Sequence, residues 1–390
     1  MLRLNSIFTV LLVAGVAGAN GQAISGFNLS HQYDPDSEVS LRMQPVRQGK
    51  NFQVLYTLSA NRKEYALSDY EIQWERRASV SSRNGETTGI RDSIWVSSGN
   101  VREGSVAVGA GEKTWFLVAR VTNRVTRGIW NFVASIELNW PVTYFLTEDN
   151  RPVTATVVLT GKTYRIGNFP AAGKLFCFYY KNAFNPAAPP FVSGAPSDRF
   201  INADSIFTLS SAVFSPRTKG LYLIQADTTA ATGMPMYAAA PPFPRYNTIG
   251  DLTGPLLYLT TADEQADLMN AGGDKSRFDK VVLGITRDTD RAKSFMRSYY
   301  QRVETVNRLF TNYKEGWRTD MGMVYLIFGV PTEVSRSATT EIWYYKGTAE
   351  KFLFNRTGSV FAPFNHFLQR NNDYTQSWYS MVDLWRKARF

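Results

Sequence analysis

The chain has 390 residues, 44% of them hydrophobic and 19% charged, which is typical of a folded globular protein and unlike a disordered chain. One cysteine excludes an intramolecular disulfide and a zinc site built from several cysteines. Two histidines, His31 and His366, leave little material for a histidine-based metal centre or catalytic relay. The length favours two or three domains.

The charge balance is basic, with 43 Lys and Arg against 33 Asp and Glu and a formal net charge of +10. No run of basic residues is longer than two, as at Arg76-Arg77. Because binding to a phosphate backbone needs clustered cations, the sequence does not predict a nucleic-acid partner. A mixed, solvated surface accounts for the excess.

The N-terminus resembles a secretory signal peptide over residues 1–23. Arg3 precedes an apolar stretch over residues 6–19, and Ala17-Gly18-Ala19 offers a cleavage site of small residues. No cysteine lies near that site, so no lipid anchor is expected, and no later apolar run is long enough for a membrane-spanning helix. We therefore expect an exported protein that is periplasmic or associated with the outer membrane.

Residues 24–146 are predicted to form a β-sandwich-like domain. Residues 70–75 alternate apolar and polar side chains, the pattern of a strand with one buried face. Other short runs are rich in aromatic and β-branched residues and are separated by Gly and Asn turns. These further strands are expected over residues 52–58, 93–96, 115–121 and 129–138.

Residues 147–250 are predicted to form a second β-rich domain or an extension of the first. Strands are expected over residues 153–159, 175–180, 205–209 and 221–226. Two stretches, residues 185–196 and 234–244, each contain four prolines. Because proline lacks the backbone N–H, the first stretch is predicted to be irregular, and the second to be a semi-rigid linker or a strand edge.

The pattern changes in residues 251–390. Thr261 and Glu264 fit a capping box that begins a helix ending near Gly272, and an apolar stripe predicts a longer helix over 289–310. Strands are then expected over residues 323–328, 341–345 and 351–354, with a final helix over 376–387. Helices followed by an antiparallel sheet make this an α+β domain, so the whole chain is predicted to be multidomain, all-β and then α+β.

The motif Gly316-Trp317-Arg318-Thr319-Asp320 resembles the signature of the GWxTD domain family of bacterial exported proteins, especially those of Bacteroidota. The resemblance covers roughly residues 258–346. It includes the helix before the motif, the following stretch from Gly322 through Tyr325 to Gly329 and Pro331, and a strand around Trp343. Met321 departs from it, because the family often has a basic residue there. The family supplies no established reaction.

The motif has a structural and a functional interpretation. Thr319 and Asp320 can fix a turn by hydrogen bonding, Gly316 and Gly322 can adopt backbone angles that other residues resist, and Trp317 can anchor the turn. Alternatively, Trp317, Asp320 and Tyr325 face a partner protein, because Trp and Tyr are common interface anchors. The candidate site comprises Gly316, Trp317, Thr319, Asp320, Gly322, Tyr325, Gly329, Pro331 and Trp343, without catalytic residues, metal or cofactor.

Export, many aromatic residues and the lack of a catalytic constellation predict a non-catalytic accessory or scaffold subunit of a cell-envelope assembly or secretion complex. Its partners are expected to be outer-membrane or periplasmic proteins. The alternative is a secreted carbohydrate-binding or surface adhesin module, which requires a row of exposed aromatic rings on one sheet face. A hydrolase that uses acidic residues from different domains also stays open.

Overall fold

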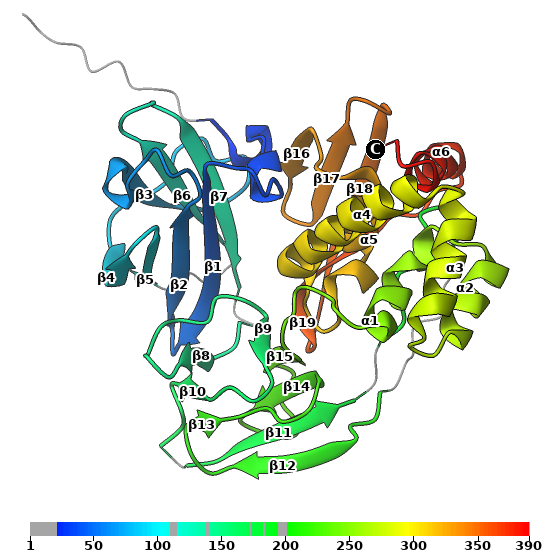
Figure 1. Cartoon of the computed structure of the whole chain (residues 1–390). Helices are drawn as coiled ribbons and strands as arrows, with labels where there is room; N and C mark the ends of the chain where they lie inside the picture. The colour runs from blue at the N-terminus through cyan, green and yellow to red at the C-terminus, as the bar shows by residue number, and fades with distance from the viewer. Residues whose placement is uncertain are drawn as a thin grey trace, which may run out of the picture.

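The computed structural model describes residues 22–109, 115–137, 140–171, 173–181, 184–193 and 201–389. Residues 1–21, which hold most of the predicted signal peptide, lie outside this part of the chain. The described residues form two β-sandwiches, at the left and at the bottom of Figure 1, and a domain of helices and one sheet at the right. The predicted fold class, all-β regions followed by an α+β domain, is confirmed.

The first sandwich contains two sheets, with strand orders β1-β2-β5-β4 and β3-β6-β7. All pairings are antiparallel, and β1 and β2 form a hairpin in which Gln48 pairs with Asn51. This is the strand order of the immunoglobulin constant-type sandwich, in which an ABED sheet faces a CFG sheet. The strands are β1 (Val39–Gln48), β2 (Asn51–Ala60), β3 (Tyr70–Arg77), β4 (Arg91–Ser98), β5 (Val101–Val108), β6 (Trp115–Asn123) and β7 (Ile129–Ile136).

One apolar cluster joins the facing sheets of this sandwich. Val54 and Tyr56 of β2 pack in the same cluster as Trp74 of β3 and Leu117 of β6. The alternation in β3 places Trp74 in this core and leaves Gln73 exposed, as the period of two predicts.

The second sandwich has its own core and is built from sheets β13-β10-β8 and β12-β11-β14-β15-β9. Buried residues of both sheets, including Phe145, Cys177 and Ile224, form one cluster. The strands are β8 (Tyr144–Thr147), β9 (Val157–Leu159), β10 (Tyr164–Gly167), β11 (Leu175–Tyr180), β12 (Ser205–Leu209), β13 (Val213–Phe214), β14 (Gly220–Gln225) and β15 (Met234–Ala239).

The prediction of a linker or strand edge over residues 234–244 is wrong for its first part. Met234–Ala239 is β15, an interior strand between β14 and β9. The parallel pairing with β9 begins only at Tyr237, beyond Pro235, so the missing N–H of that proline does not interrupt the ladder on that side.

The third domain places its helices against the antiparallel sheet β16-β17-β18-β19 (Figure 1). Thr261 caps α2 through the predicted capping box with Glu264, and α4 spans the predicted residues. The elements are α1 (Ile249–Thr253), α2 (Ala262–Asn270), α3 (Lys275–Thr286), α4 (Thr289–Phe310), α5 (Asp320–Phe328), β16 (Glu333–Arg336), β17 (Thr340–Tyr345), β18 (Glu350–Ser359), β19 (Ala362–Leu368) and α6 (Tyr374–Arg386).

The strand expected over residues 323–328 is wrong, because these residues belong to helix α5. All nine residues of α5 are buried. A helix that is apolar on every side shows no periodicity of 3.6, and a short apolar run of this kind cannot be distinguished from a buried strand by pattern alone.

The segment before the first sandwich crosses to the third domain. Ile24, Phe27 and Leu29 are buried in the third domain's apolar cluster. The Leu29 N–H donates to the Val334 carbonyl of β16 at 2.9 Å. The third domain therefore contains residues that precede the first sandwich in the sequence as well as residues that follow the second.

Polar contacts and one aromatic stack join the first sandwich to the third domain. Arg356 of β18 donates from Nη1 to the Ser135 hydroxyl at 2.7 Å and forms an ion pair with Glu137. The Trp140 ring stacks on Phe364 of β19 with 4.0 Å between ring centroids.

The second sandwich contacts both other domains. Arg151 Nε lies 2.5 Å from Glu103 Oε2 in β5 of the first sandwich. On the other side, the Thr156 hydroxyl donates to the Thr311 carbonyl just after α4. Every pair of domains is thus in direct contact.

Candidate functional site

The Gly-Trp-Arg-Thr-Asp motif forms the turn between α4 and α5. Gly316–Arg318 make one 3-10 turn, and Thr319 is the N-cap of α5. The Thr319 hydroxyl donates to the Gly316 carbonyl at 2.8 Å and accepts from the Gly322 N–H at 3.0 Å. An N-cap side chain satisfies a backbone donor that the helix itself leaves unpaired, so Thr319 fixes both the turn and the start of α5.

Gly316 and Gly322 are needed for space and not for unusual backbone angles. Neither glycine has a positive φ angle. A Cβ on Gly316 would lie 2.1 Å from the Val306 carbonyl oxygen in α4, and a Cβ on Gly322 would lie 1.8 Å from the Gly316 carbonyl oxygen. The two glycines therefore allow α4, the turn and α5 to touch backbone to backbone, which corrects the expectation from the sequence.

Gly329 does use the freedom of glycine. It ends α5 with φ +82°, and its carbonyl accepts from the Tyr345 hydroxyl at 2.9 Å. Pro331 is buried just beyond it, before β16 begins. The Gly-x-Pro turn thus directs the chain from helix α5 into strand β16.

Asp320 ties the start of α5 to the end of the sheet. It is 7% exposed, and its carboxylate accepts from the Leu368 N–H at 3.0 Å and from Arg370 Nη2 at 2.5 Å. A carboxylate in the first turn of a helix also offsets the positive end of the helix dipole.

Trp317 points inward, where it meets Glu315. The indole is 2% exposed, and its N–H donates to the Tyr246 hydroxyl at 3.0 Å and to Glu315 Oε2 at 3.2 Å. The buried Glu315 carboxylate also binds Lys219 of the second sandwich at 2.7 Å and Arg318 at 2.9 Å. Burial alone raises the pKa of Glu315, but Lys219 and Arg318 outweigh it and hold the pKa below its usual value.

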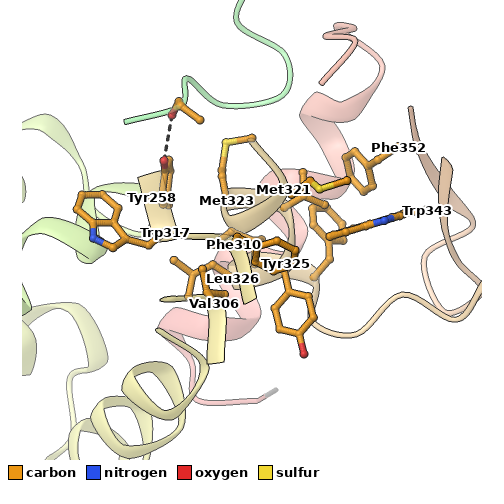
Figure 2. Close-up of a cluster of buried hydrophobic side chains, with 14 of the residues drawn as sticks. Tyr258, Val306, Phe310, Trp317, Met321, Met323, Tyr325, Leu326, Trp343 and Phe352 are labelled. Atoms are coloured by element: carbon orange, nitrogen blue, oxygen red, sulfur yellow. Dashed lines mark hydrogen bonds between the residues drawn. The ribbon is translucent and has the colours of Figure 1, made fainter. Parts of the chain in front are cut away.

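Tyr325 lies in a cluster of aromatic rings between the helices and the sheet (Figure 2). Its ring centroid is 5.5 Å from Phe310 and 6.4 Å from Trp343, and Tyr325 is 2% exposed. Its hydroxyl donates to the Tyr33 carbonyl in the N-terminal segment at 2.8 Å.

A fully buried carboxylate lies beside this cluster. Glu341 accepts from the Tyr33 hydroxyl at 2.5 Å and from the Trp343 indole at 2.8 Å, and it pairs with Arg336 at 2.8 Å. Burial raises the pKa of Glu341, but Arg336 reverses the shift, so the carboxyl stays ionised at neutral pH. Arg336 also donates to the Val133 carbonyl of β7 at 3.1 Å, which links this network to the first sandwich.

The motif also holds a segment that overlaps the stretch predicted to be irregular, residues 185–196. We call Phe184–Phe191, between β11 and β12, the strap. The Ala187 N–H donates to the Arg318 carbonyl at 2.8 Å, and Arg318 Nη1 donates to the Phe184 carbonyl at 3.3 Å. The sequence shows prolines here, but nothing in it indicates which surface they meet.

Two clefts lie where the three domains meet. One, of about 480 Å³, is lined by His31, Arg42 and Arg308, and its neighbour, of about 360 Å³, shares both arginines and adds His366. Burial lowers the pKa of each histidine to about 4, so both are neutral at pH 7. Among the described residues, no group of three His, Cys, Asp or Glu side chains is placed to hold a metal ion.

The site thus consists of buried side chains that bond to other parts of the same chain. Trp317, Asp320 and Tyr325, which the interface interpretation placed toward a partner, all point into the protein. Sequence reasoning missed Glu315, Lys219 and the strap, because each acts through a contact with a residue far away in the chain.

Over the described ranges, no helix combines the length and apolar character that crossing a membrane requires.

Comparison with known proteins confirms the resemblance found in the sequence. Residues 220–387 match the GWxTD domain, and this match covers the third domain together with β14 and β15 of the second sandwich. Below, the name GWxTD domain is used for the third domain. No curated protein matches the chain.

Similar solved structures include DIP-gamma IG1+IG2, with 12% sequence identity over 52% of this chain and 97% of that chain. A chimeric titin Z1Z2 carrying an exogenous KLER peptide from decorin has 14% identity over 52% of this chain and 96% of that chain. The TM-score is 0.18 in both cases, which is too low to support a statement about this fold.

Proposed function

We propose that the chain is an exported, non-catalytic scaffold subunit of a cell-envelope protein assembly or secretion complex, bound to outer-membrane or periplasmic proteins. One observation carries the proposal: the charged side chains of the GWxTD turn, residues 315–320, bind other parts of the chain. Glu315 binds the second sandwich through Lys219, Arg318 binds the strap, and Asp320 binds the end of the sheet through Arg370. A turn used in this way fixes the relative positions of domains, which is what a scaffold requires.

The immunoglobulin-like strand order of the first sandwich agrees with this proposal, since sandwiches of this architecture are common among cell-surface domains. That agreement is one of fold alone. The carbohydrate-binding alternative has no specific support. Among the described residues, the large exposed aromatic rings Phe207, Phe367 and Tyr379 lie on β12, β19 and α6, three separate elements, and not in a row on one sheet.

The test is native affinity purification of the tagged, full-length protein from detergent-solubilised envelopes, followed by mass spectrometry. We expect stoichiometric recovery of an outer-membrane or periplasmic protein. Recovery of the tagged chain alone, in two detergents and at monomer size, would contradict the proposal.

A pair of variants links that result to the turn. Lys219→Met removes the ion pair between the second sandwich and Glu315, and we expect it to recover less of the partner. Lys275→Met removes an exposed pair with Asp279 within α3 and serves as the matched control, with recovery unchanged.

A further inference from the structure

The strap leaves the second sandwich and crosses the surface of the GWxTD domain. It lies between β11, which ends at Tyr180, and β12, which begins at Ser205. Its sequence is Phe-Asn-Pro-Ala-Ala-Pro-Pro-Phe, with prolines at positions 186, 189 and 190. The strap therefore belongs to one domain in sequence and to another in its contacts.

The GWxTD domain binds the strap chiefly through its backbone carbonyls. Five strap carbonyls accept hydrogen bonds from this domain's described residues, at 3.0 to 3.3 Å. The donors are Arg318 to Phe184, Lys314 to Asn185, the Tyr258 hydroxyl to Ala187, Arg370 to Ala188, and the Asn371 N–H to Pro190. Figure 2 shows the Tyr258 hydrogen bond as a dashed line.

This pattern of donors suits a proline-rich ligand. Proline has a backbone carbonyl but no N–H. A surface that donates hydrogen bonds to backbone carbonyls therefore binds proline without leaving a backbone N–H unpaired. Proline also restricts the unbound peptide to extended conformations, which lowers the entropy lost on binding. In the opposite direction, the Ala187 N–H donates to the Arg318 carbonyl.

The side chains of the strap add two aromatic anchors and one tight position. The Phe184 ring packs edge-on against Tyr313 at 4.8 Å between centroids, and Phe191 lies 5.4 Å from Tyr379. Between them, Ala187 is 9% exposed and packs in the core cluster of the GWxTD domain. The surface thus accepts an aromatic residue at each end and a small residue in the middle.

We propose that this surface is a peptide-binding site for an extended, proline-containing segment of a partner protein, and that the strap occupies it in cis. The proposal rests on the scaffold function above, because it names the chemistry by which the partner attaches. A tethered strap competes at an effective concentration of about 1 mM. The site is therefore closed in the isolated chain and opens when the strap is displaced.

The experiment uses the full chain with residues 184–191 replaced by eight Gly and Ser residues. A fluorescent synthetic peptide of sequence 184–191 is titrated with this chain, and its anisotropy is measured. We expect a dissociation constant of about 10 µM, with binding to the unaltered chain about 100-fold weaker because its own strap competes. Failure of the folded, strap-replaced chain to bind the peptide overturns the proposal.

Matched variants test the individual contacts. In the strap-replaced chain, Tyr258→Phe removes one donor to the peptide and should weaken binding about fivefold. Tyr374→Phe removes a hydroxyl that donates to the Lys351 carbonyl in the same domain, and binding should not change. A peptide with Ala187→Arg should not bind, and equal binding of both peptides contradicts the proposed site.

A second measurement covers the case in which strap replacement prevents folding. Ala187→Arg in the intact chain should expel the strap and allow the unaltered peptide to bind in trans. It should also raise hydrogen exchange at position 187 and at Val192, because both N–H groups are hydrogen-bonded in the folded chain. Raised exchange without peptide binding overturns the proposal, as does a dimer formed by exchange of straps. These measurements use the pure chain, so they succeed or fail independently of the envelope purification.

Discussion

Replacing Gly322 by Ala gives the sharpest test of how the GWxTD turn is built. In an ordinary helix this change stabilises, because Ala is favoured over Gly by about 1 kcal/mol. Here the new Cβ would lie 1.8 Å from the Gly316 carbonyl oxygen and 2.8 Å from the Thr319 hydroxyl. Ordinary contact begins at 3.4 Å, so the turn and α5 must separate.

That separation breaks the hydrogen bonds that Thr319 makes to Gly316 and Gly322, three in number. Their loss costs about 3 kcal/mol, and overpacking adds about 2 kcal/mol, of which helix propensity returns about 1 kcal/mol. We therefore expect Gly322→Ala to destabilise the GWxTD domain by about 4 kcal/mol.

Gly284→Ala in α3 is the matched control. This glycine is also helical, but it is exposed and nothing lies within 4 Å of its Cβ position. We expect it to stabilise the domain by about 0.5–1 kcal/mol. The assay is urea unfolding at 25 °C, monitored by the hydrogen exchange of the α5 amides. These amides report on the stability of this domain alone. Equal or greater stability of Gly322→Ala would refute the reasoning.

Three further predictions concern buried ionisable groups. Glu341→Gln removes the buried carboxylate that pairs with Arg336 and should cost about 3 kcal/mol in urea unfolding, whereas Glu333→Gln at an exposed pair should cost under about 0.5 kcal/mol; similar losses would contradict this. Because burial lowers the pKa of His31 and His366 to about 4, the unfolded chain binds more protons below pH 6.5, so stability should fall from pH 6.5 to 5. Replacing both His31 and His366 by Gln should flatten the dependence of stability on pH, and an unchanged dependence refutes the assignment of the effect to these histidines. Burial raises the pKa of Cys177 to about 12, so its thiol should react with a disulfide reagent at pH 8 only on unfolding; immediate reaction contradicts it.

Part of this structure follows from local pattern. The apolar stripe of 289–310 and the Thr261–Glu264 capping box specify α4 and the start of α2, because each depends on residues three or four apart. The alternation in residues 70–75 likewise specifies β3. The motif Gly316–Asp320 was sufficient to identify the domain, and the family match confirms it.

Other features were decided only by tertiary contacts. The pattern of residues 323–328 predicts a strand where the structure has helix α5, because burial on all sides removes the periodicity that distinguishes a helix from a strand. The need for glycine at positions 316 and 322 comes from backbones that meet across the turn, and not from a backbone angle that local sequence can signal.

The sequence by itself thus determined the order of the all-β and α+β regions, elements such as β3, α2 and α4, and the position of the turn. The tertiary structure decided what the turn holds: Lys219, the strap and the end of the sheet. These partners lie about 50 to 130 residues from the motif, and hydrogen bonds and ion pairs of such separation leave no periodic trace in the sequence. Only the folded chain brings their donors and acceptors within 3.3 Å of one another.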